Sequence, residues 1–105
     1  MKPHEYVILE IARERERQID KEGWSLHHDD THKSGEMARA AACYALQSTL
    51  GDTVGTINIS YLLWPWQGLW WKPTTPRRDL VKAAALIVAE IERLDRAAQE
   101  SGEGK

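Results

Sequence analysis

A short polar stretch near residue 30 carries the densest set of side chains that could do chemistry. It reads Trp24-Ser-Leu-His-His-Asp-Asp-Thr-His-Lys-Ser-Gly35, and Glu36 follows directly. Histidine and carboxylate side chains titrate, bind metal ions and form hydrogen bonds with polar ligands. The Asp, Thr, Ser and Gly content predicts a loop or a short irregular turn.

Three interpretations of this stretch remain open from the residues alone. The first is turn and cap chemistry, in which Asp29 or Asp30 accepts local amide hydrogen bonds and Ser34 caps the next helix. The second is a metal site, with carboxylates for magnesium or manganese or the histidines for zinc. The third is a pocket for a small nucleotide-like ligand, and its candidate residues are His28, Asp29, Asp30, His32 and Glu36.

A tryptophan-rich segment is the second unusual feature. It reads Trp64-Pro-Trp-Gln-Gly-Leu-Trp-Trp-Lys-Pro73 and holds four of the five tryptophans. It could be a lid over the core, an oligomer interface, or a stacking wall for a base, with Trp24, Trp66 and Trp71 as the stacking candidates. Four clustered indoles are hard to bury in one small domain, so we expect a homo-oligomer.

Cationic side chains follow the tryptophans closely and could bind phosphate groups. The candidates are Lys72, Arg77, Arg78 and Lys82. Asp79 lies among them in the first turn of a predicted helix, where it could complement the helix dipole and pair with Lys82, or face a ligand site. We expect the side chains of residues 28–36 to face those of residues 72–82 across a cavity.

The longest predicted helix begins at Pro76, with Thr75 as its cap, and no Gly or Pro interrupts the next twenty residues. Its apolar residues recur with helical spacing and predict one continuous buried seam. The seam comprises Leu80, Ala84, Ile87, Ile91, Leu94 and Ala98, with a second seam of Val81, Ala85 and Val88 beside it. We expect a domain over residues 1–96 and a frayed polar tail over residues 97–105.

Two further helices are predicted, over residues 3–22 and 36–50. Gly23 ends the first helix, and the alanine-rich second helix can approach residues 83–85 of the third closely. The first helix has an apolar stripe, which comprises Val7, Ile8, Ile11, Ala12 and Ile19, and its charged residues, Glu14 among them, are expected to face solvent. The predicted fold class is therefore all-α, with three main helices and an irregular Trp-rich insertion between the second and third.

Composition limits the function classes. The 105 residues carry a formal net charge of -2, so the composition gives no electrostatic case for general nucleic-acid or membrane-surface binding. No apolar run reaches the length of about 18 residues that a membrane span needs. The lone Cys43 is typical of a small buried side chain, and a cytoplasmic location is the default expectation.

The motifs together resemble small proteins of unknown function that tailed bacteriophages and prophages carry. The resemblance rests on Arg-Gln-Ile-x-x-Glu-Gly-Trp at 17–24, His-Asp-Asp-x-His at 28–32, Gly-Glu at 35–36, Trp-Pro-Trp at 64–66 and Trp-Lys-Pro at 71–73. Arg-Asp-Leu-Val-Lys-Ala and Ala-Glu-Ile-Glu-Arg-Leu-Asp-Arg, within residues 78–96, complete the pattern. This resemblance brings no known activity with it.

A weaker resemblance is to the MazG-type all-α nucleoside triphosphate pyrophosphohydrolases. Gly35-Glu36-Met37-Ala38 looks like the start of their first metal-binding helix, and Asp79 could match a later aspartate. The resemblance implies magnesium as the cofactor, with Glu36 and Asp79 as ligands. The chain departs from the family pattern because no further acid follows Glu36 before Leu50.

The leading functional hypothesis is a phage-encoded accessory protein that binds a small nucleotide-like ligand, for example to sequester a host nucleotide signal in counter-defence. The first alternative is a magnesium-dependent nucleoside triphosphate pyrophosphohydrolase. The second alternative is a module that binds a host protein through its tryptophans. The sequence assigns no catalytic residue.

Overall fold

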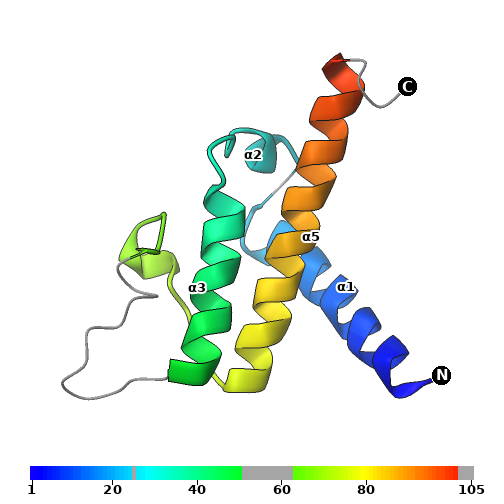
Figure 1. The fold of residues 1–105 in the computed structure, drawn as a ribbon, viewed down its shortest axis with the longest axis vertical. Helices are drawn as coiled ribbons and strands as arrows, with labels where there is room; N and C mark the ends of the chain where they lie inside the picture. The colour runs from blue at the N-terminus through cyan, green and yellow to red at the C-terminus, as the bar shows by residue number, and fades with distance from the viewer. Residues whose placement is uncertain (25, 51–62, 102–105) are drawn as a thin grey trace.

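The computed structural model describes residues 1–24, 26–50 and 63–101. Its helices are α1 (Pro3–Lys21), α2 (Leu26–Asp30), α3 (Glu36–Leu50) and α5 (Pro76–Ser101), with a short 3-10 helix, η1, at Gly68–Trp70 (Figure 1). The described residues include no strand. The predicted all-α class with three substantial helices is therefore confirmed. Residues 51–62 of the predicted insertion lie outside the described residues.

Helices α3 and α5 form the core of the fold. They lie side by side and run in opposite directions (Figure 1). Small residues of both helices meet between them, because alanine side chains let two backbones approach closely. The buried cluster comprises Ala40, Ala41, Cys43 and Tyr44 of α3, Ala83 and Leu86 of α5, and Trp64.

The main apolar seam of α5 is not buried, contrary to the prediction. Leu80, Ile87, Ile91 and Leu94 are 51%, 49%, 52% and 51% exposed. Helices α3 and α1 contact other sides of α5, where Val81, Ala85, Leu86 and Ala89 are buried. The part of the second predicted seam formed by Val81 and Ala85 is thus buried, whereas Val88 remains partly exposed.

The most buried side chains of α1 are charged and polar, whereas the predicted apolar stripe is only partly buried. Glu14, Arg15 and Gln18 are buried. Of the stripe, Ile11 and Ile19 are half-buried, and Val7, Ile8 and Ala12 are exposed. Arg15 binds Asp29 of α2 at 2.7 Å and Glu92 of α5 at 3.1 Å. The expectation that Glu14 faces solvent is wrong, because Arg17 and Arg78 both bind its carboxylate.

Helix α2 occupies part of the stretch for which a loop or irregular turn was predicted. Its two aspartates connect it to its neighbours, because Asp29 binds Arg15 of α1 and Asp30 binds Arg96 of α5 at 2.8 Å. Helix α5 continues to Ser101, beyond Arg96, after which the frayed tail was expected to begin. The ion pair with Asp30 holds Arg96 against α2.

The two neighbouring aspartates provide a stability test of these contacts. The side chain of Asp29 is 2% exposed and that of Asp30 is 38% exposed. Removing one partner of a buried pair leaves an uncompensated charge and costs about 3–5 kcal/mol, whereas an exposed pair contributes about 0–1 kcal/mol. Asp29→Ala should therefore lower the free energy of unfolding far more than Asp30→Ala in urea titrations. Equal, small changes would contradict the structural role given to the Arg15–Asp29 pair.

Candidate functional site

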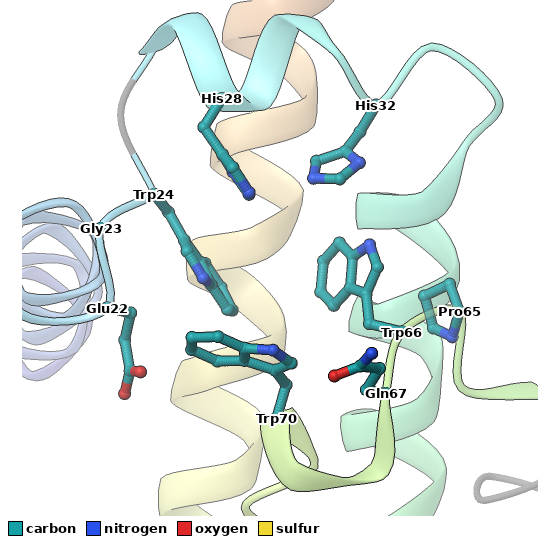
Figure 2. Close-up of a pocket in the computed structure, with 9 residues that line it drawn as sticks. All are labelled: Glu22, Gly23, Trp24, His28, His32, Pro65, Trp66, Gln67 and Trp70. Atoms are coloured by element: carbon teal, nitrogen blue, oxygen red, sulfur yellow. The ribbon is translucent and has the colours of Figure 1, made fainter.

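A cavity of about 530 Å³ lies between α2, the end of α1 and the tryptophan-rich segment. We call it the tryptophan cavity. Figure 2 shows His28 and His32 pointing down from α2 and the turn after it toward Trp24 and Trp66, with Trp70 on the opposite side. The complete lining is Glu22, Gly23, Trp24, His28, His32, Pro65, Trp66, Gln67 and Trp70.

Gly23 turns the chain so that Trp24 reaches this cavity. Its φ of +74° lies in the left-handed region that glycine adopts without steric cost. The turn lets the Trp24 amide donate to the carbonyl of Gln18 at 3.0 Å. The ring centroids of Trp24 and Trp66 are consequently 5.5 Å apart.

The tryptophan-rich segment packs on α3 and divides into core and cavity residues. Trp64 is buried, and its indole N–H donates to the carbonyl of Gln67 at 3.1 Å. The ring centroids of Trp64 and Trp71 are 4.8 Å apart, and both rings pack against Tyr44. Trp71, a predicted ligand residue, therefore lines neither cavity described here. Trp66 and Trp70 line the tryptophan cavity.

A carboxylate orients one of the two cavity histidines. The Nδ1 atom of His32 lies 3.3 Å from Glu36, which also accepts a hydrogen bond from the Ser34 amide. When Nδ1 carries the proton, Nε2 is left as an acceptor. His32 Nε2 and Trp66 Nε1 are buried, and neither has a hydrogen-bond partner among the described residues. One wall of the cavity thus holds polar atoms that no group in the described ranges satisfies.

The second histidine is held in its neutral form. Burial lowers the pKa of His28, and the nearby His32 lowers it further, while Asp29 opposes both effects. The two imidazole rings meet edge to face with centroids 4.6 Å apart. His28 therefore adds a neutral imidazole to the aromatic lining of the cavity near pH 7.

A second cavity of about 480 Å³ adjoins the first and shares Glu22, Trp24 and Trp70 with it. We call it the cationic cavity, because four cations and two carboxylates line it. The complete lining is Glu14, Arg17, Gln18, Glu22, Trp24, Tyr44, Trp70, Lys72, Thr74, Thr75, Arg78 and Lys82. Burial raises the pKa of Tyr44 to about 12, so its phenol is neutral at physiological pH.

The two carboxylates of the cationic cavity stay ionised because cations surround them. Burial alone raises the pKa of Glu14, but hydrogen bonds from Arg17 and Arg78 outweigh that effect and leave the pKa below its ordinary value. The pKa of Glu22 is also lowered, because Arg17 and Lys72 outweigh burial. Lys72 lies between the two cavities, with its Nζ 3.1 Å from Glu22 and 5.5 Å from the Trp70 ring centroid.

Lys82 and Asp79 fix the backbone that leads into α5. Lys82 Nζ donates to the carbonyl of Lys72 at 2.8 Å and to the hydroxyl of Thr74 at 3.1 Å. Asp79 accepts a hydrogen bond from the Thr74 amide at 2.8 Å and lies 3.8 Å from Lys82. Burial lowers the pKa of Lys82, and Asp79 opposes that effect. Lys82 thus lines the cationic cavity, and Asp79 holds the backbone of Thr74, which also lines it.

The predicted metal ligands are not brought together. Glu36 begins α3 and Asp79 lies in the first turn of α5, and the antiparallel arrangement puts these helix starts at opposite ends of the pair (Figure 1). Within the described part of the chain, no group of three or more His, Cys, Asp and Glu side chains is placed to hold a metal ion. The residues present therefore do not fit the magnesium site that the pyrophosphohydrolase resemblance implies.

The structure divides the predicted ligand residues into two groups. Seven line one or both cavities: Trp24, His28, His32, Trp66, Lys72, Arg78 and Lys82. The other five lie elsewhere. Asp29 and Asp30 form the ion pairs of α2, Glu36 supports His32, Trp71 packs on Tyr44, and Arg77 binds Glu10 at the surface.

Sequence reasoning missed Arg17, Glu22 and Trp70 as lining residues. Trp70 belongs to the tryptophan-rich segment, and Glu22 directly precedes the helix-ending Gly23, so both had a local signal. Arg17 had none, because its role depends on Glu14 and Glu22, which only the folded chain places beside Arg78 and Lys72.

Comparisons with protein-family models, curated proteins and solved structures find no match for this chain. Among the helices of the described ranges, none combines the length and apolar character that crossing a membrane requires.

The lowered pKa of Glu14 predicts acid sensitivity. A carboxylate whose pKa is lowered by folding contributes stability above its unfolded pKa and loses it as the pH falls through the folded value. The free energy of unfolding should therefore fall as the pH drops below about 4.5, the ordinary value for Glu. Glu14→Gln should flatten this decline in urea titrations from pH 6 to pH 3, whereas Glu16→Gln, at an exposed position on α1, should retain it. Equal slopes in both variants would contradict the assignment.

Proposed function

We propose that this chain binds a small nucleotide-like ligand, with an aromatic ring in the tryptophan cavity and one or more phosphate groups in the cationic cavity. One observation carries the proposal: the two cavities share Glu22, Trp24 and Trp70, so an aromatic site and a cationic site adjoin each other. The volume of the tryptophan cavity alone falls within the range of about 300–1,000 Å³ that is usual for ligand pockets.

The tryptophan cavity suits a planar heteroaromatic ring. Trp24, Trp66 and Trp70 offer indole surfaces, and stacking of a base on an aromatic side chain contributes about 1–3 kcal/mol. Neutral His28 can donate or accept a hydrogen bond at the ring edge. These properties favour a base over an aliphatic ligand, which would leave the polar edge of the cavity unused.

The cationic cavity suits a polyanion. Arg17 and Arg78 carry guanidinium groups that match phosphate geometry, and Lys72 and Lys82 add two ammonium groups. Glu22 already binds Lys72 and Arg17, and Glu14 binds Arg17 and Arg78. An incoming phosphate therefore has to compete with both carboxylates. The competition favours ligands with several negative charges over a single weak anion.

The phage-protein resemblance suggests one biological form of this binding, which is sequestration of a host nucleotide signal. The pyrophosphohydrolase alternative has less support, because Glu36 and Asp79 lie at opposite ends of the α3–α5 pair. The host-protein alternative also has less support, because Trp64 is buried and the neighbouring indoles pack against the core of the same chain.

A ligand panel tests the proposal directly. Nucleoside triphosphates and cyclic dinucleotides should raise the melting temperature, since a ligand at about 100 times its Kd adds about 2.7 kcal/mol of stability. A nucleoside and inorganic pyrophosphate, each filling one cavity only, should bind more weakly in calorimetry. Failure of every nucleotide to shift the melt at millimolar concentration would overturn the proposal.

Matched variants separate the two cavities. Lys72→Gln removes a cation beside Glu22, and we expect nucleotide binding to weaken about 10-fold, equivalent to about 1.4 kcal/mol. Trp70→Leu removes an indole that both cavities share and should weaken both nucleotides and nucleosides. Lys33→Gln removes an exposed lysine outside both linings and should leave the Kd unchanged. A Lys72→Gln variant that binds as tightly as the Lys33→Gln control would contradict the phosphate assignment.

A further inference from the structure

The seam of α5, formed by Leu80, Ala84, Ile87, Ile91 and Leu94, is only partly covered by the described residues. Its four large side chains are each about half exposed. Their steps of 4, 3, 4 and 3 residues give the 3.5-residue period of a two-helix seam, which is narrower than the face a helix turns toward a globular core. Such a seam is stable when a second helix packs along it.

We propose that this seam pairs with the same seam of a second copy of the chain, with the two α5 helices antiparallel about a twofold axis close to Ile87. Leu80 and Leu94 lie seven residues on either side of Ile87. An antiparallel pair centred there brings Leu80 of one copy to Leu94 of the other and Ile87 to Ile87. The apolar pattern is thus complementary to itself, as a twofold contact requires.

Charge complementarity supports this partner and this direction. Arg77 and Asp95 are 18 residues apart, which is five helical turns, so they lie on the same side of α5 beyond opposite ends of the seam. The antiparallel arrangement places Arg77 of each copy beside Asp95 of the other. A parallel arrangement would instead place like charges together. Arg77 remains largely exposed although it binds Glu10, so it is accessible to a second carboxylate.

The proposed contact leaves both cavities open. Successive residues of a helix are rotated by about 100°, so Arg78 and Lys82 lie on the side of α5 opposite the seam. They line the cationic cavity, and the seam residues line neither cavity. Self-association is therefore independent of the proposed ligand binding, and either could fail without the other.

Sedimentation equilibrium of the full chain between about 1 and 100 µM tests the contact. We expect a dimer for the wild-type chain and a dimer Kd at least about 100-fold weaker for Ile87→Asp, because each dimer would bury two carboxylates in an apolar seam. Ile87 is exposed in the single chain, so the helical circular dichroism should be unchanged. Leu69→Asp, at an exposed position in η1, is the matched control and should remain dimeric. A monomeric wild-type chain, or a dimer that Ile87→Asp leaves intact, would overturn the proposal.

Cysteine cross-linking tests the direction. A chain carrying both Arg77→Cys and Asp95→Cys should form a disulfide-linked dimer under mild oxidation, visible on a non-reducing gel. Arg77→Cys alone should not, because the two copies of position 77 would lie roughly 30 Å apart along the helices. Cross-linking of the single Arg77→Cys variant, or none in the double variant, would contradict the antiparallel arrangement. The wild-type chain, whose only cysteine is the buried Cys43, is the control and should not form a cross-linked dimer.

Discussion

Ion pairs between α1 and its neighbours position α2 and the charged wall of the site. Arg15 bridges Asp29 of α2 and Glu92 of α5, so α2 is held where the other two helices meet. That placement brings His28 and His32 over the tryptophans. Glu14, next to Arg15 on α1, and Glu22, directly after the end of α1, bind cations that also line the second cavity. The contacts that hold α1 in place are therefore also part of the cavity walls.

This arrangement also explains why the chain exposes so much apolar surface. Buried ion pairs contribute little net stability, since desolvation offsets much of the attraction, but they fix geometry because any misplaced charge is costly. The apolar contribution comes from the alanine-rich α3–α5 contact and from the indoles packed on α3. With α1 attached through charges, one side of α5 keeps its leucines and isoleucines available for another helix.

The helices were predictable, but the faces that they bury were not. Helices α1, α3 and α5 could be predicted because their signals are local: the helical spacing of apolar residues, Pro76 at a helix start and Gly23 after a helix end. Periodicity shows that a helix face is apolar but not which element covers it. Helix α5 has two apolar faces, and only the alanine-rich face is buried against the other helices. The role of Arg15 had no local signal, because its partners Asp29 and Glu92 lie 14 and 77 residues away. Residue type identified His28, His32 and Lys72 as site candidates, and the structure places them in the cavity linings. It equally suggested Asp29, which instead forms a buried ion pair with Arg15.

The central claim is that the tryptophan and cationic cavities form one ligand site. The five indole N–H groups, resolved in a two-dimensional NMR spectrum, report on both cavities and on the core at once. Titration with a nucleoside triphosphate should shift the Trp24, Trp66 and Trp70 signals with one common Kd, while Trp64, which donates to the Gln67 carbonyl in the core, changes least. Unchanged spectra at millimolar nucleotide, or shifts confined to Trp64 and Trp71, would contradict the claim.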